Sequence, residues 1–199
     1  MQESTARPGR PRDPHADEAI LAAARDLLAE GGLVNLTVEG TAQRAGVAKT
    51  TVYRRYPTKL ILAVSAVAAL ITPMPESESV DGMIRTSLEL FRGQIGSPTG
   101  QRAFLAVAAA AAGDPVVHQL FAEKVLAPLQ ASVTQALDEA RARGDASLDA
   151  SPEFVFDVLM GTIVHRAIIR QDPPDDDFRH KFTELTRYVY MGQPKAPGD

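Results

Sequence analysis

Cations, hydroxyl groups and aromatic rings are concentrated in residues 37–59, which read TVEGTAQRAGVAKTTVYRRYPTK. This stretch contains five Lys or Arg residues and one acidic residue, Glu39, so its net charge is +4 in a chain whose formal net charge is -4. A local excess of positive charge attracts the phosphate backbone of nucleic acids. The stretch is therefore the candidate site, and the chemistry it suits is nucleic-acid binding.

The rest of the chain contains no residue pattern typical of catalysis or metal binding. There is no nucleophile elbow, no phosphate-cradling glycine loop and no zinc-ligand spacing. Asp175, Asp176 and Asp177 suit the dipole of a helix N-terminus, which accounts for them without a bound cation. We predict no catalytic residues, no metal site and no cofactor, and we predict that the protein is not an enzyme.

Two short helices joined by a turn are expected to position the basic stretch. Thr37 can cap the first helix with its hydroxyl, and Gly46 supplies the backbone freedom that a sharp turn requires. The second helix begins near Ala48, whose side chain offers no cap, at a cost of about 1 kcal/mol. Val52 and Tyr56 are four residues apart and can face inward together, while donors and cations crowd the rest of this segment.

Helices are also expected on both sides of this motif. A first amphipathic helix starts at Asp13, ends at Gly31 and Gly32, and packs behind the motif. A further helix, capped by Thr58, is expected to extend to Ile71. This last helix is the natural connection between two domains.

The run AGVAKTTVYRRYPTKLIL, residues 45–62, resembles the signature of the TetR (tetracycline-repressor-like) family of bacterial transcription regulators. The resemblance covers roughly residues 16–65. It implies an all-α fold, with an N-terminal three-helix helix-turn-helix DNA-binding domain and a C-terminal helical domain for ligand binding and dimerisation. The expected divisions are a flexible basic arm over 1–12, the DNA-binding domain with its connecting helix over 13–72, and the second domain over 73–199.

The resemblance also implies which side chains contact double-stranded DNA. The candidates are Thr37, Lys49, Thr50, Thr51, Tyr53, Arg54, Arg55 and Lys59. Thr50, Thr51 and Arg54 are assigned to base edges, where Arg54 can form a bidentate pair with guanine. Lys49 suits either bases or phosphates, and the other four are assigned to phosphates. Glu39 either accepts a hydrogen bond from cytosine or stays solvated.

Charge and composition agree with one nucleic-acid-facing end. Residues 1–72 hold nine Lys or Arg and seven Asp or Glu, whereas residues 73–199 hold twelve and eighteen. The arginines of residues 1–12 either form a solvated tail or enter a narrow minor groove. With no Cys, no secretory signal and no apolar run long enough for a bilayer, we predict a cytoplasmic protein without membrane contact.

The second domain is expected to be helical throughout. Residues 153–170 are apolar around nearly the whole helical circumference, so this helix requires cover on two sides. One cover is its own domain and the other is a second copy of the chain. With a final helix that carries the apolar stripe Phe178, Phe182, Leu185 and Val189, it predicts a four-helix homodimer interface. Pro128 is expected to kink a long helix before this region.

A small-molecule pocket is the other feature expected of the second domain. The candidate lining residues are Phe91, Phe104, His118, Phe121, Met160 and His165. In this interpretation His118 and His165 supply polar contacts among aromatic side chains. The alternative is a plain hydrophobic core, with both histidines in the core or an interface.

The function predicted from these features is a homodimeric, sequence-specific transcriptional regulator. We expect a repressor that a small hydrophobic ligand releases from a near-palindromic operator. The alternative is an effector-independent regulator, or an activator, whose second domain only dimerises.

Overall fold

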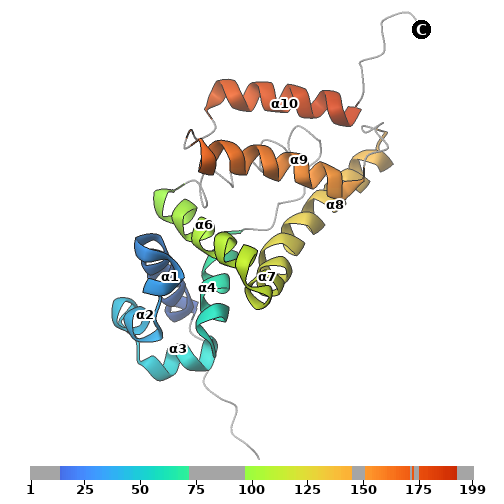
Figure 1. The fold of residues 1–199 in the computed structure, drawn as a ribbon. Coiled ribbons are helices and arrows are strands. Elements are labelled where there is room, and N and C mark those ends of the chain that lie inside the picture. Colours follow the sequence, from blue (N-terminus) through green and yellow to red (C-terminus); the bar gives the residue numbers. More distant parts are fainter. Residues whose placement is uncertain (1–13, 72–96, 145–150, 171, 173–174, 192–199) are drawn as a thin grey trace, which may run out of the picture.

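The computed structural model describes residues 14–71, 97–144, 151–170, 172 and 175–191 (Figure 1). These residues form helices joined by short connections, and no strand occurs among them. The predicted all-α fold is therefore confirmed. The arginine-rich residues 1–12, the proposed domain boundary near residues 72–79 and the candidate pocket residue Phe91 lie outside the described residues.

The helices α1 (Pro14–Asn35), α2 (Val38–Ala45) and α3 (Lys49–Arg55) form the N-terminal three-helix unit (Figure 1). Ile20 and Leu28 of α1, Leu36 in the connection and Val52 of α3 are fully or almost fully buried. The backbone of α1 leaves helical geometry at Gly31 and Gly32, as the glycine pair predicts, and one further turn follows.

The turn between α2 and α3 forms as its residues predict. Thr37 Oγ1 accepts a hydrogen bond from Gly40 N at 2.9 Å, which caps α2. Gly46 ends α2 with a φ of 67°, in the left-handed region that glycine adopts at low cost. Ala48 provides no side-chain cap to α3. The helix-turn-helix prediction is thus correct in its capping details.

Helix α4 (Lys59–Ala68) runs behind this unit and contributes the fully buried side chains of Leu62, Val64 and Val67. Thr58 Oγ1 caps it by accepting a hydrogen bond from Ile61 N at 3.1 Å. The helix ends three residues before Ile71, the predicted end, and residues 69–70 form a turn. Near that end, Arg25 of α1 donates from Nη1 to the Ala66 carbonyl at 3.3 Å and satisfies one of the last carbonyls of α4.

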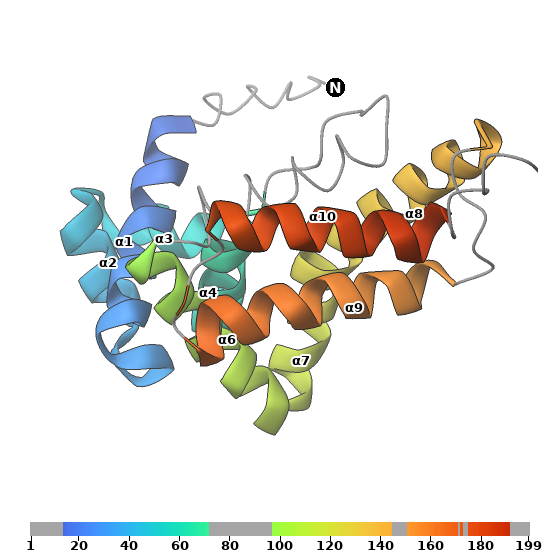
Figure 2. The ribbon, with the colours of Figure 1, turned by 90° about the horizontal axis from the view of Figure 1, so that it is seen from above.

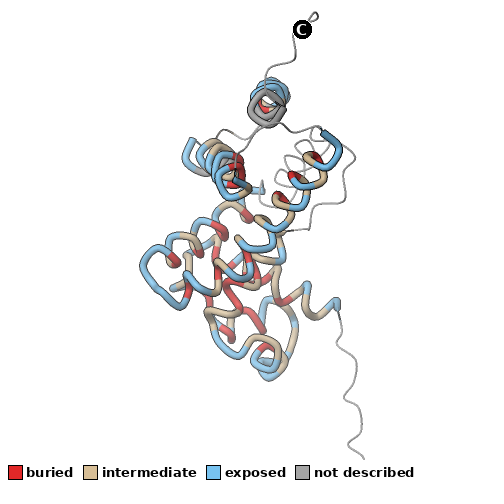
Figure 3. Tube along the Cα trace, turned by 90° about the vertical axis from the view of Figure 1, so that its right-hand side faces the viewer, coloured by how far each residue is buried: buried red, intermediate tan, exposed pale blue. Residues whose placement is uncertain are grey.

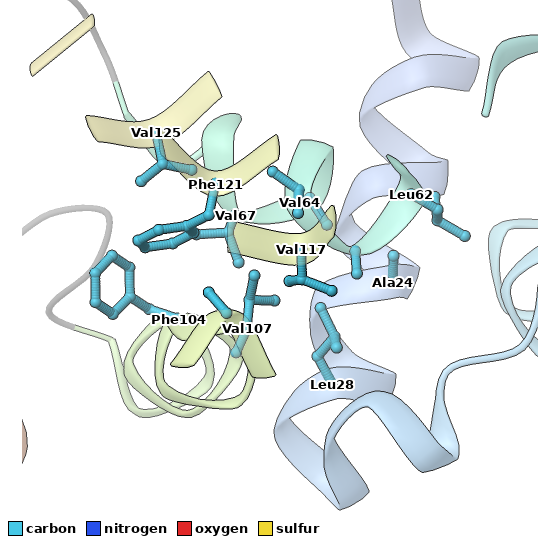
Figure 4. Close-up of a cluster of buried hydrophobic side chains, with 14 of the residues drawn as sticks. Ala24, Leu28, Leu62, Val64, Val67, Phe104, Val107, Val117, Phe121 and Val125 are labelled. Carbon is cyan, nitrogen blue, oxygen red and sulfur yellow. The ribbon is translucent and has the colours of Figure 1, made fainter. Parts of the chain in front are cut away.

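The second part of the chain packs directly on these helices. Helix α6 (Pro98–Gly113) lies against α1, while α7 (Pro115–Phe121) and the π-helical segment η2 (Ala122–Leu126) lie against α4. Figure 4 shows buried side chains from all five elements meeting in one cluster. Figure 3 shows that buried positions in this half of the molecule lie on the inner sides of the helices, with exposed positions around them. The N-terminal three-helix unit and α6 therefore share one core.

Helix α8 (Ala127–Ala142) continues directly from η2. The expected irregularity at Pro128 takes the form of η2, which lies on the N-terminal side of the proline. Proline has no N–H to donate, and its ring clashes with the carbonyl of the residue four before it, so the preceding turn widens.

Two helices form the far end of the molecule. Helix α9 (Pro152–Val164) continues into the π-helical segment η3 (His165–Ile169), and α10 (Asp176–Met191) runs alongside α9 in both Figure 1 and Figure 2. Val155, Phe156 and Leu159 of α9 are buried against the rest of the chain. No helix in the described part of the chain is long and apolar enough to cross a membrane.

Candidate nucleic-acid interface

Helix α3 has one buried side, at Val52, and a polar side that faces solvent. Val52 is fully buried and fixes the helix to the core, whereas Lys49, Thr50, Tyr53 and Arg54 are exposed. Thr51, the remaining candidate for base contact, is half-buried. The helix lies at the end of the molecule opposite α9 and α10 (Figure 1). The structure therefore brings these five candidates together on a surface that a duplex can reach.

Arg55 does not belong to this exposed face, which corrects its assignment to a phosphate. Its side chain is 9% exposed and forms an ion pair with Asp17 of α1. The hydroxyl of Tyr56 donates to the same carboxylate, at 3.2 Å from Oδ1. The reason is helical geometry, since Arg55 lies three residues after the buried Val52 and on the same side of α3. Arg55 and Tyr56 thus fasten the end of α3 to α1.

Lys49, the first residue of α3, forms an ion pair with Glu39 in the first turn of α2. Its Nζ also lies 5.5 Å from the centroid of the Tyr53 ring. The hydrogen bond with Lys49 lowers the pKa of the Glu39 carboxyl and raises that of the lysine, so both groups are charged at neutral pH. Glu39 is exposed, as the solvated interpretation expected, but its carboxylate is paired with Lys49.

Thr37 and Lys59 flank α3 at the starts of two other helices. Thr37 is exposed, and its Oγ1 already accepts from Gly40 N, so the hydroxyl hydrogen remains to donate to a phosphate. Lys59 is half-buried in the first turn of α4, beside backbone N–H groups at a helix N-terminus.

A third ion pair joins α1 and α2. Arg44 donates from Nη1 and Nη2 to the Glu30 carboxylate at 2.7 and 3.2 Å. That hydrogen bonding lowers the pKa of Glu30 and raises the pKa of Arg44. Sequence reasoning missed Asp17, Glu30 and the pairing of Glu39. No local pattern marks these acids, because each pairs with a residue at least ten positions away.

The five candidate ligand contacts that the structure describes do not assemble into one pocket. Phe104 and Phe121 are buried and meet edge to face, with ring centroids 5.6 Å apart, and Met160 is half-buried elsewhere against the core. His118 and His165 are exposed, which corrects the interpretation that they contribute polar atoms beside those rings. His118 directly follows the buried Val117, and consecutive residues of a helix point in different directions.

A surface depression of about 590 Å³ runs along α8. Its lining is Ala127, Gln130, Ala131, Thr134, Gln135, Asp138 and Glu139. None of the five described candidate ligand contacts lines it. In the described part of the chain, no three His, Cys, Asp or Glu residues gather as a metal site would require.

An exposed polar helix held by a buried valine, after a glycine turn and a capped helix of eight residues, defines a helix-turn-helix DNA-binding protein. Residues 20–65 match the family model for bacterial regulatory proteins of the tetR family, and residues 74–186 match the model for the tetracyclin repressor-like C-terminal domain. The chain belongs to the TetR family of transcriptional regulators.

Individual relatives agree with this assignment. Rv1556 of Mycobacterium tuberculosis, an uncharacterized HTH-type transcriptional regulator, is 31% identical over 84% of this chain and 86% of its own length. The crystal structure of the TetR family regulator SCO0332 is 26% identical, with a TM-score of 0.66 over 88% of this chain and 98% of that chain. The flavonoid-responsive regulator FrrA shares the fold at 23% identity, with a TM-score of 0.62 over 92% of this chain and 100% of its own.

Proposed function

We propose that this regulator is a homodimeric repressor, which a small hydrophobic ligand releases from a near-palindromic operator. The observation that carries the proposal is the arrangement of α3. Its polar side is exposed around Thr50 and Arg54, while Val52 and the Arg55–Asp17 pair hold its other side against the domain. A helix fixed in this way enters a major groove as a rigid body, so its side chains meet defined base edges.

The exposed residues divide by the group that each can reach. Thr50, Thr51 and Arg54 lie within α3 and are the proposed base contacts, with Arg54 donating to guanine O6 and N7. Thr37, Tyr53 and Lys59 are the proposed phosphate contacts, and they set the register of the helix in the groove. Arg54 has no ion-pair partner among the described residues, which supports its availability to a base.

The apolar residues left exposed at the far end support dimerisation. Phe154, Val158, Ile169 and Leu185 are between 40% and 67% exposed, although α9 buries other apolar side chains in its own chain. A second copy that covers α9 and α10 would form a four-helix interface. In the dimer, two α3 helices about 34–36 Å apart would enter successive major grooves.

Control by a ligand would act through the core shared by the two parts of the chain. Helix α6 packs against α1, and α7 and η2 pack against α4. A change among α6, α7 and η2 therefore reaches α1, which is paired with α3 through Asp17, and α4, which follows α3 in the chain. A ligand that prefers a state with differently spaced α3 helices would weaken operator binding by that difference in affinity. FrrA, named as flavonoid-responsive, has this fold, which is compatible with control by a small molecule. We retain 13–72 and 73–199 as the proposed DNA-binding and effector-binding domains.

A second candidate function has one observation in its favour. Because Phe104 and Phe121 pack against each other and both histidines are exposed, the described core contains no polar group directed at a ligand from those positions. An effector-independent regulator, or an activator whose second domain only dimerises, fits that arrangement.

Selection of bound fragments from random duplexes tests the repressor proposal, followed by a screen of hydrophobic compounds for release. We expect a near-palindromic site and at least one releasing compound. Selection of a single half-site would contradict the dimer. Selection of a palindrome that no compound releases would favour the effector-independent alternative.

A further inference from the structure

The ammonium group of Lys49 is occupied on two sides. Glu39 pairs with it from α2, and the Tyr53 ring, one turn further along α3, has its centroid 5.5 Å from Nζ. The pair lies at the surface, with the Lys49 side chain 49% exposed and the Glu39 side chain 60% exposed. Lys49 and Tyr53 are four residues apart and therefore lie on the same side of α3. The Lys49–Glu39 ion pair is thus next to Tyr53, one of the proposed phosphate contacts.

The neighbouring cations are in a different situation. Neither Arg54 nor Lys59 forms an ion pair with any residue that the structure describes. Of Lys49, Arg54 and Lys59, Lys49 is therefore the one that is paired with a carboxylate, which belongs to Glu39 of α2. Glu39 is in the first turn of a helix that Thr37 caps, so its backbone position is fixed.

We propose that Glu39 holds Lys49 away from DNA phosphates and thereby limits how strongly the protein binds duplexes of any sequence. The inference rests on the DNA-binding function proposed above and deepens it by naming a residue that sets the sequence-independent part of the affinity. A phosphate that displaced Glu39 would leave a carboxylate unpaired beside a polyanion. Replacing the Glu39 carboxylate by a phosphate therefore gives Lys49 no additional negative partner.

The consequence is a smaller number of neutralised phosphates. Each phosphate that a Lys or Arg neutralises releases condensed counterions, and this release dominates binding to non-specific duplexes. Lys49 makes no such contribution while Glu39 retains it. The base contacts proposed for Thr50, Thr51 and Arg54 are unaffected, so loss of Glu39 should strengthen binding to operator and random duplex by a similar factor.

The test measures binding of a random-sequence duplex by Glu39→Gln, Lys49→Gln and the double variant, by fluorescence anisotropy between about 50 and 200 mM salt. In Glu39→Gln the freed lysine should bind one more phosphate. The slope of log affinity against log salt should steepen by about 0.9, with binding about fivefold tighter near 0.1 M salt. Lys49→Gln and the double variant should both keep the slope of the unmodified chain. Glu139→Gln, an equal charge change on α8, is the matched control and should also leave the slope unchanged.

Each other result overturns the inference. An unchanged slope in Glu39→Gln shows that Lys49 gains no phosphate. A flatter slope in Lys49→Gln shows that the lysine already contacts one. A gain that persists in the double variant shows that Glu39 acts by repulsion without Lys49. If the unmodified chain fails to bind DNA, the proposed function falls as well, whereas normal binding by the unmodified chain with any of the other results overturns this inference alone.

Discussion

Asp17, in the first turn of α1, and Arg55, the last residue of α3, form an ion pair that ties the recognition helix to the helix behind it. The Tyr56 hydroxyl donates to the same carboxylate, so one acid holds two consecutive residues. The position of α3 relative to the rest of the domain thus depends on a contact that lies outside the proposed DNA surface.

Loss of that acid should weaken both folding and DNA binding. In Asp17→Asn the mostly buried guanidinium of Arg55 loses the negative charge of Asp17, which should cost about 1–3 kcal/mol of unfolding free energy. Urea unfolding followed by circular dichroism measures this. Glu30→Gln removes the carboxylate of a more exposed pair and should change stability little. Equal losses of unfolding free energy in the two variants would show that burial of Arg55 does not make its ion pair more important for stability than the exposed pair.

A side chain at Gly46, in the turn before α3, should lower the stability of the protein. Gly46→Ala places a Cβ at a φ of 67°, where an L-residue is strained by about 1–2 kcal/mol, although nothing lies within 4 Å of that atom. Gly113→Ala is a matched control, because the space there is equally open and the residue is at the end of α6 without a positive φ. Thermal melts should show a lower Tm for the first variant and no decrease for the second. A lower Tm in both variants would mean that the added methyl group is costly in itself, and that the left-handed backbone at Gly46 is not the cause.

Much of the helix-turn-helix unit was predictable from sequence because its determinants are local. A hydroxyl at Thr37 and a glycine at 46 act within one helical turn of their own positions. Arg55 was assigned wrongly for the same reason: its local setting is a run of cations, and its partner is 38 positions earlier in the chain.

The ligand-pocket residues were less predictable. Sequence composition identifies Phe104 and Phe121 as buried, but it does not give the rotation of α7 that leaves His118 exposed. An apolar helix with one histidine has the same composition whichever way it faces, and only the packing of neighbouring helices settles the choice.

Charge placed on the exposed face of α9 should yield monomers. Phe154→Asp and Val158→Asp alter side chains that are 58% and 40% exposed in the single chain, so each variant should remain folded. Light scattering coupled to gel filtration should report the mass of one chain for both. Val116→Asp, at a 59% exposed position on α7, should remain a dimer. If the α9 variants still dimerise, the interface lies elsewhere.

The attachment of α10 should depend on Arg166 of η3. Its guanidinium lies 4.3 Å from the centroid of the Phe178 ring, and Nη2 is 3.1 Å from Asp172 Oδ2. Arg166→Met should cost about 1–2 kcal/mol, since it removes a partly desolvated cation–π contact and the ion pairs with Asp172 and Asp175. Arg170→Met removes a more exposed partner of the same Asp172 and should cost little. Chemical denaturation measures the unfolding free energy of both variants. Equal losses would show that Arg166 contributes no more than Arg170 to the attachment of α10.

In the proposed complex the exposed face of α3 reads bases, while Lys59 at the start of α4 binds a phosphate. Titration of Arg54→Ala and Lys59→Ala against every single-base variant of the selected operator tests it most directly. We predict that Arg54→Ala costs about 1–3 kcal/mol and relaxes the preference at one base position in each half-site, whereas Lys59→Ala weakens all variants equally and flattens the salt dependence. An unchanged preference profile in Arg54→Ala would contradict the account.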